Sequence, residues 1–140
     1  MDNRLFAVVD TNVIVSALIS RRIDSSPMKV MGYLYSGRII PIWNEEIITE
    51  YEEVLSREKF HLNAEDIEEA LAVFRKFGLQ IDKAPVPDVA DFPDPKDIVF
   101  YEVKRSKEDA YLVTGNIKHF PHEPHVVTPR ELVDLLDQQQ

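Results

Sequence analysis

Short apolar segments alternate along this chain with longer segments whose apolar residues recur at helical spacing. The apolar segments span residues 5–9, 39–42, 79–81, 110–113 and 125–127. Strands separated by helices pair as parallel strands, because each helix returns the chain to the edge where the strand began. We therefore predict an α/β fold, a three-layer α/β/α sandwich with a central, mostly parallel sheet. Residues 98–101 are apolar enough to leave a helix and a strand both open there.

Capping residues indicate where the helices begin and end. A first helix is predicted over 11–20, directly after the first strand. Ser26-Pro27 is typical of an N-cap followed by proline at the first helical position, and Gly37 is placed to end that helix. Further helices are predicted to begin near Asn44, Asn63, Asp94 and Thr128, the last with a capping box.

Composition limits the classes of protein that this chain can be. Its 140 residues are expected to form one domain over 1–137, with a frayed tail at 138–140. The absence of cysteine excludes disulfides and thiolate zinc sites. No apolar run is long enough for a membrane span and the N-terminus does not resemble a signal peptide, so we expect a cytoplasmic protein with no membrane partner.

The net charge of −9 argues against direct attraction to the phosphates of a nucleic acid. Carboxylates that hold divalent cations would account for part of that charge, and the cations would then bridge to phosphates. The basic pairs Arg21-Arg22, Arg75-Lys76 and Lys104-Arg105 are explained most simply as solvated surface.

Asp10 is the strongest candidate for a functional residue, because it directly follows the apolar strand 5–9. Open α/β sheets bind ligands at the carboxyl ends of their strands. A carboxylate there is costly without a partner, and Mg²⁺ and Mn²⁺ prefer oxygen ligands. The position also allows Asp10 to cap the following helix.

Further acids and polar residues are candidates for the same site. On a helical wheel Glu50 and Glu52 both flank the apolar stripe of their helix, and periodicity does not choose between them. Asp94 can cap a helix, and Asp97 lies in the first turn, where an acid favours the positive helix end. Thr114-Gly115-Asn116 follows another apolar strand.

Other site chemistries lack their motifs. His119, His122 and His125 are separated by prolines and cannot share a helical face, which favours a polar loop over a histidine metal site. The chain has no phosphate-binding glycine loop, no His-Glu-x-x-His motif and no serine nucleophile elbow.

The segment 8–13, followed by Ser16-Ala17-Leu18, resembles the first motif of PIN domains. Residues 94–100 and 111–116 resemble later motifs of that family. His119-Phe120-Pro121 is similar to the branch described as toxins of toxin–antitoxin pairs. The motifs occur in the family's order over nearly the whole chain. The resemblance implies a metal-dependent ribonuclease with an α/β/α fold, Mg²⁺ or Mn²⁺ as cofactor, RNA as substrate, an antitoxin as partner and a homodimer.

The resemblance also assigns roles to residues. It places the family's metal-binding acids at Asp10, Glu50 and Asp97, and its small polar positions at Thr11, Asn12 and Thr114. The family's fourth acid often falls where this chain has Asn116, an oxygen ligand without charge. Lys118, Lys104 and Arg105 are candidates for gripping the RNA backbone.

These residues lead to one principal hypothesis and two alternatives. The principal one is an endoribonuclease that cuts single-stranded RNA and, by the family mechanism, leaves a 5′-phosphate and a 3′-hydroxyl. Asn116 and the net charge motivate a degenerate PIN module that binds RNA or a partner protein without cutting. A phosphatase or receiver-like domain that uses Asp10 as nucleophile is disfavoured, because no second aspartate lies nearby in the sequence.

Overall fold

The computed structural model describes residues 4–82, 92 and 94–139. Within these residues, five strands form one parallel sheet in the order β3-β2-β1-β4-β5. The strands are β1 (Leu5–Val9), β2 (Ile39–Trp43), β3 (Leu79–Gln80), β4 (Tyr111–Val113) and β5 (Val126–Val127). The helices are α1 (Thr11–Ile19), α2 (Ser26–Ser36), α3 (Glu45–Leu55), α4 (Ala64–Phe77), α5 (Ile98–Arg105) and α6 (Pro129–Gln138). The predicted α/β fold with a parallel sheet is confirmed.

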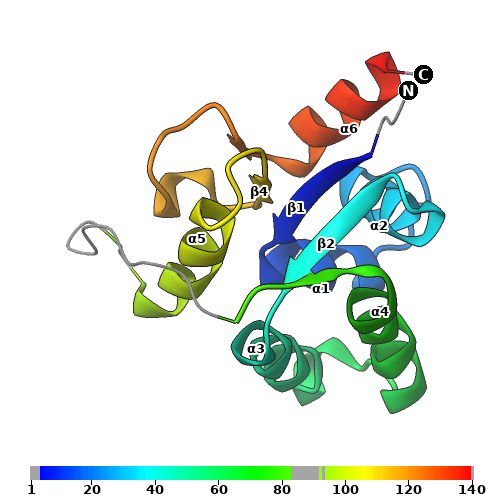
Figure 1. The fold of residues 1–140 in the computed structure, drawn as a ribbon. Coiled ribbons are helices and arrows are strands. Elements are labelled where there is room, and N and C mark those ends of the chain that lie inside the picture. Colours follow the sequence, from blue (N-terminus) through cyan, green and yellow to red (C-terminus); the bar gives the residue numbers. More distant parts are fainter. Residues whose placement is uncertain (1–3, 83–91, 93, 140) are drawn as a thin grey trace.

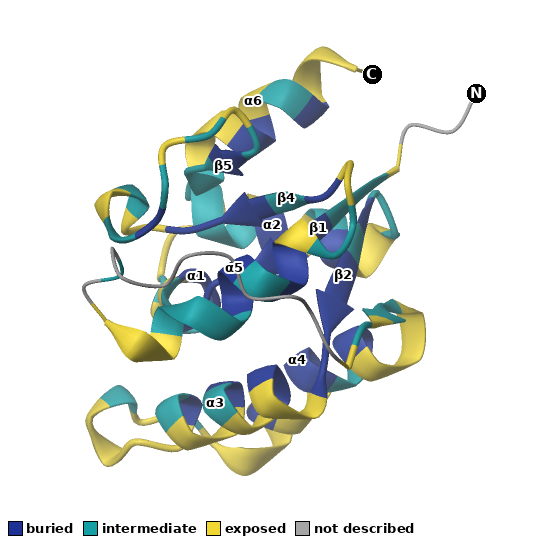
Figure 2. Cartoon of the chain, turned by 60° about the vertical axis from the view of Figure 1, so that its left-hand side comes forward, coloured by how far each residue is buried: buried dark blue, intermediate teal, exposed yellow. Residues whose placement is uncertain are grey.

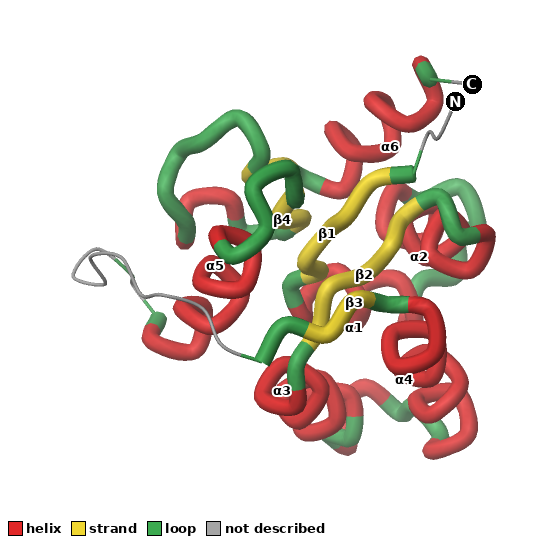
Figure 3. The backbone as a smooth tube through the Cα atoms, in the orientation of Figure 1, coloured by secondary structure: helices red, strands yellow, loops and turns green. Residues whose placement is uncertain are grey.

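Helices lie on both sides of the sheet (Figures 1 and 3). The chain passes from β1 to β2 through α1 and α2, and it passes from β3 back across the sheet to β4 through α5. These two crossovers run in opposite directions, so right-handed connections place α1 and α2 on one face and α5 on the other. The helix α6 packs against α2, and α5 packs against β1 and β4.

The three central strands form the middle of the hydrophobic core (Figure 2). Val8 and Val9 of β1, Ile42 of β2, and Leu112 and Val113 of β4 are each 0% exposed. Strands buried on both faces have continuously apolar sequences, whereas strands with one exposed face alternate between apolar and polar residues. The central strands could therefore be predicted from the sequence. Among the described residues, no helix is both long and apolar enough to cross a membrane.

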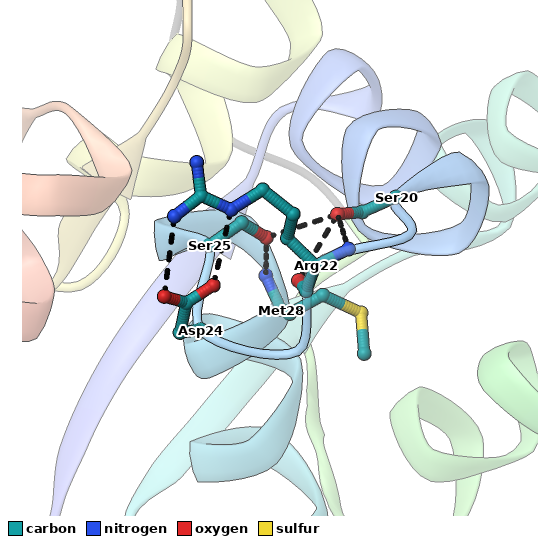
Figure 4. Close-up of polar contacts among 5 residues, drawn as sticks. All are labelled: Ser20, Arg22, Asp24, Ser25 and Met28. Carbon is teal, nitrogen blue, oxygen red and sulfur yellow. Dashed lines mark hydrogen bonds and ion pairs between the residues drawn. The ribbon is translucent and has the colours of Figure 1, made fainter.

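The turn between α1 and α2 corrects one predicted boundary (Figure 4). The N-cap of α2 is Ser25, whose hydroxyl accepts a hydrogen bond from the backbone N–H of Met28. Ser26 is therefore the first helical residue and Pro27 the second. At the other end of the turn, the hydroxyl of Ser20, the residue after α1, accepts a hydrogen bond from the backbone N–H of Arg22. Proline is tolerated throughout the first helical turn, so its position alone does not identify the cap.

The ambiguity over residues 98–101 is resolved as helix, since they form the first turn of α5. Phe100, Tyr101 and Val103 are buried whereas Glu102 is only partly so, a spacing typical of a helix that covers a sheet. Three other predicted starts are confirmed: Asn44 caps α3, Asn63 caps α4, and Thr128 forms a capping box with Glu131. The segment predicted to open a helix at Asp94 is instead the 3₁₀ turn Pro95–Asp97, and α5 itself begins at Ile98. A cap followed by proline suits a 3₁₀ turn as well as an α-helix, and such turns are frequent at the start of α-helices.

The strand order fixes where a ligand can bind. The strand β1 lies in the centre of the sheet, and the connection from it leads to β2 on one side while β4 pairs on the other. In open parallel sheets such a reversal opens a crevice at the carboxyl ends of the two strands. Val9 pairs with Val113, so the residues that follow them, Asp10 and Thr114, are neighbours at this crevice.

Candidate functional site

Asp10 is buried, with 5% of its surface exposed, at the carboxyl end of β1. Its Oδ2 atom accepts two side-chain hydrogen bonds, one from the hydroxyl of Thr114 at 2.7 Å and one from Nδ2 of Asn12 at 3.1 Å. Asn12 in turn accepts from the backbone N–H of Gly115 at 3.0 Å. Residues from the ends of both central strands therefore fix the orientation of this carboxylate.

Glu50 reaches the same region from α3. Its Oε2 atom accepts a hydrogen bond from the hydroxyl of Thr11 at 2.9 Å. Glu52, which the helical wheel did not distinguish from Glu50, is exposed. The contact with Thr11 at the start of α1 therefore distinguishes Glu50 from Glu52.

Asp97 is the last residue of the short 3₁₀ turn Pro95–Asp97 and lies directly before α5, as its N-cap. Its side chain is 14% exposed, and its Oδ2 atom lies 3.2 Å from Nδ1 of His119. Asp94 accepts a hydrogen bond from the backbone N–H of Lys96, so it caps the 3₁₀ turn and not, as predicted, the α-helix. Its side chain is exposed.

The three carboxylates repel one another. The pKa of Asp10 is raised to about 6, mainly by burial and to a smaller extent by the charges of Asp97 and Glu50, while hydrogen bonds from Thr114 and Thr11 oppose the rise. Burial and the charge of Asp94 raise the pKa of Asp97, whereas His119 lowers it. Such a cluster of acids is under electrostatic strain that a cation would relieve.

The three acids do not form a ready-made cage for a metal ion. Within the described parts of the chain, no group of three or more histidine, aspartate and glutamate side chains is arranged so that it could hold a metal ion. Mg²⁺ does not require such a cage, because it commonly keeps several waters and binds through one or two carboxylates together with substrate phosphates. The side-chain hydrogen bonds described above fall on one oxygen of each acid, Oδ2 of Asp10 and of Asp97 and Oε2 of Glu50.

The remaining predicted residues contribute less. Asn116 is exposed; its backbone N–H donates to the hydroxyl of Thr114, while its side chain makes no hydrogen bond to the three acids in the described structure. Lys118 is exposed on the same loop. Lys104 is buried and pairs with Glu123 at 3.1 Å, so it is not available to grip a phosphate. Arg105 donates to the hydroxyl of Tyr101.

Sequence reasoning missed two residues near the acids. His119 was assigned to a polar loop, yet it contacts Asp97. Tyr51 was expected only in the apolar stripe of α3, but its hydroxyl donates to the carbonyl oxygen of Val9, immediately before Asp10. Two signals could have found them: the loop after β4 leaves the sheet at the same edge as Asp10, and a buried tyrosine hydroxyl requires a partner.

A groove of about 480 Å³ runs beside Glu50, between α3 and the start of α5. Its charged lining consists of Glu46, Glu50, Glu53 and Glu102, with Lys96 as the opposing charge. Burial and the charge of Glu46 raise the pKa of Glu102. A nucleic acid strand near these acids therefore needs cations between its phosphates and the protein.

One comparison with known proteins gives a family match. A family model described as PIN domain matches residues 7–118, which include Asp10, Glu50, Asp97 and Asn116. Searches of curated proteins and of solved structures give no significant match.

Proposed function

This chain belongs to the PIN domain family, whose members are generally nucleases, and we propose that it is a metal-dependent endoribonuclease that cuts single-stranded RNA. The observation that carries the proposal is the buried carboxylate of Asp10 at the crevice between β1 and β4, next to Glu50 and Asp97. A buried acid whose pKa is raised to about 6 by burial and by two other acids is typical of a functional site.

Asp10, Glu50 and Asp97 are the residues that would hold Mg²⁺ or Mn²⁺. Their oxygen atoms suit hard divalent cations, and the chain contains no cysteine that would favour softer metals. When bound, the cation supplies an activated water and neutralises charge on the attacked phosphate.

The other residues of the site orient these acids. Thr114 and Asn12 hold Oδ2 of Asp10 in place, and Thr11 holds Oε2 of Glu50. Hydrogen bonds that fix a ligand's orientation typically change metal affinity or activity by 10–100-fold when they are removed. Lys118 is exposed on the loop after β4 and is a candidate contact for the RNA backbone.

Asn116 favours a second candidate, a PIN module that binds RNA or a partner protein without cutting it. Where the family often has a fourth acid, this chain has an exposed amide. The two functions differ in their need for a cation, because a module that only binds does not require Mn²⁺.

The resemblance of residues 119–121 extends the proposal to a biological role. We propose that the enzyme is the toxin of a toxin–antitoxin pair, forms a homodimer and is neutralised by an antitoxin protein. Growth arrest on expression of the wild-type chain, but not of an Asp10→Asn variant, would support a toxic nuclease.

The deciding experiment is cleavage of a labelled single-stranded RNA by the wild-type protein and by Asp10→Asn, each with Mn²⁺ or with EDTA. We expect cleavage by the wild type with Mn²⁺ alone, with 5′-phosphate and 3′-hydroxyl ends. Asp24→Asn is the control, because it makes the same change at an exposed acid that pairs with Arg22. Cleavage that survives Asp10→Asn indicates a contaminating nuclease. Wild-type protein that binds RNA but never cleaves it favours the binding module.

A further inference from the structure

The loop between β4 and β5 is attached to one side of α5 at successive points. His119 contacts Asp97 at the start of the helix. Phe120, the next residue of the loop, is buried. Glu123 accepts hydrogen bonds from the hydroxyl of Tyr101 and from Nζ of Lys104. Positions 97, 101 and 104 are spaced four and three residues apart, so they lie along one side of a helix.

This attachment restricts where the His119 side chain can lie. Lys104 and Glu123 are 11% and 28% exposed in their side chains, so their ion pair is partly shielded from water. A loop held by a shielded ion pair and a buried phenylalanine presents His119 to Asp97 in a defined position. His122, in contrast, is exposed on the same loop.

Each of the three acids is held by a polar group from another part of the chain. Thr114 donates to Asp10 and Thr11 donates to Glu50. The third acid, Asp97, has His119. An ionised carboxylate oxygen only accepts hydrogen bonds, so toward such an Asp97 the donor is Nδ1–H of the imidazole.

We propose that His119 is a positioning residue that donates a hydrogen bond from Nδ1 to Asp97 and holds this carboxylate in the orientation that binds the divalent cation. This inference rests on the proposed function, because it assigns His119 to the support of the same metal site. It gives the loop after β4 a role in the site that does not depend on the uncharged Asn116.

Three variants test the proposal. His119→Ala removes the donor, and His119→Asn retains an N–H group close to the place of Nδ1. His122→Ala is the matched control, since it removes an exposed histidine three residues along the same loop. The affinity for Mn²⁺ is measured by isothermal titration calorimetry without RNA, and kcat and KM are measured with a labelled single-stranded RNA.

We expect His119→Ala to weaken Mn²⁺ binding by ~10-fold and to lower kcat to a similar extent, with KM for the RNA unchanged. His119→Asn should restore most of both values, and His122→Ala should match the wild type. Unchanged Mn²⁺ affinity in His119→Ala overturns the proposal. So does an Asn variant as weak as the Ala variant, because the donor is then not what matters. A raised KM with unchanged kcat also overturns it, since His119 would then contact RNA.

The wild-type titration separates this proposal from the proposed function. If the wild type binds Mn²⁺ and cleaves RNA while His119→Ala behaves identically, only the positioning role of His119 fails. If the wild type neither binds Mn²⁺ nor cleaves RNA, the metal-dependent nuclease fails and the role of His119 fails with it. Circular dichroism and the Tm of each variant establish that the measured differences come from folded protein.

Discussion

The hydroxyl of Thr114 donates a hydrogen bond to Oδ2 of Asp10 across 2.7 Å, joining residues 104 positions apart in the sequence. Both atoms are buried, at the point where β1 and β4 end side by side. The same hydroxyl accepts from the backbone N–H of Asn116, which orients its proton toward Asp10. One threonine thus links the central acid of the site to the loop that carries His119.

Removing this hydroxyl should impair the site without removing any of its acids. In Thr114→Val the shape is retained but Asp10 loses a donor, so we expect a further rise in the pKa of Asp10 and a ~10-fold loss of Mn²⁺-dependent cleavage. Thr114→Ser keeps the hydroxyl and is the matched control. Equal activities of the Val and Ser variants would show that the hydrogen bond does not support the site.

Asp10→Asn should stabilise the metal-free protein above about pH 6. The folded-state pKa of Asp10 is about 6 and the ordinary value is 3.8, so the folded protein binds this proton more tightly than the unfolded chain does. Stability contributed by the neutral acid is therefore lost as the pH rises from about 4 to about 6. Ionisation of Asp10 lowers the free energy of unfolding by about 3 kcal/mol in all, or roughly 10 °C in Tm. Asparagine does not ionise, so the variant keeps this stability at high pH.

Thermal unfolding in EDTA between pH 4 and pH 8 checks this expectation. The Tm of Asp10→Asn relative to wild type should increase with pH, and Mn²⁺ should raise the Tm of the wild type alone. Asp24→Asn is a suitable control, because Asp24 is exposed and hydrogen bonds from Arg22 lower its pKa. A metal-free Asp10→Asn protein that melts below the wild type at pH 8 would contradict the conclusion that the ionised Asp10 carboxylate destabilises the metal-free fold.

The two glutamates of α3 should differ in their effect on cleavage. We expect Glu50→Gln to reduce Mn²⁺-dependent cleavage by more than ~100-fold, since it removes a proposed ligand and not merely a supporting hydrogen bond. Glu52→Gln changes the same charge two residues further along the helix, at an exposed position, and should leave cleavage near the wild-type rate. Cleavage rates of the two variants, measured in one assay, test whether Glu50 and not Glu52 supports cleavage. Equal losses would count against Glu50 as a ligand.

Tyr51→Phe should lower the stability of the fold. The Tyr51 ring is completely buried, and its hydroxyl donates to the carbonyl oxygen of Val9. Loss of this hydrogen bond is expected to cost about 1 kcal/mol, or ~3 °C in Tm. Tyr35→Phe is the control, because Tyr35 is 51% exposed and such a substitution usually changes stability by less than ~0.5 kcal/mol. Identical Tm values for the two variants would show that the hydrogen bond from Tyr51 to Val9 does not stabilise the end of β1.

Much of the architecture was predictable because it depends on local signals. The runs 5–9 and 110–113 are continuously apolar, as strands buried on both faces must be. The caps Asn44, Asn63 and Thr128 were identified because their side chains bond to backbone groups within three residues. Residues 98–101 were ambiguous because one helical turn of apolar residues has the same composition as a short strand.

The site was less predictable, since its contacts join distant parts of the chain. Periodicity left Glu50 and Glu52 equivalent, and the contact with Thr11, 39 residues away, separates them. Lys104 was a candidate to grip RNA until the fold placed Glu123 beside it. His119 looked like part of a polar loop because no pattern in the sequence links it to Asp97.

The sequence by itself determined the type of sheet and the place of Asp10 at its carboxyl edge, because strand and helix periods and caps are properties of neighbouring residues. Only the tertiary structure decided which polar groups meet there. The order of the strands brings Thr114 to Asp10, and the packing of the loop after β4 against α5 brings His119 to Asp97. Distances across a sheet depend on how all the elements pack together, and no local pattern records them.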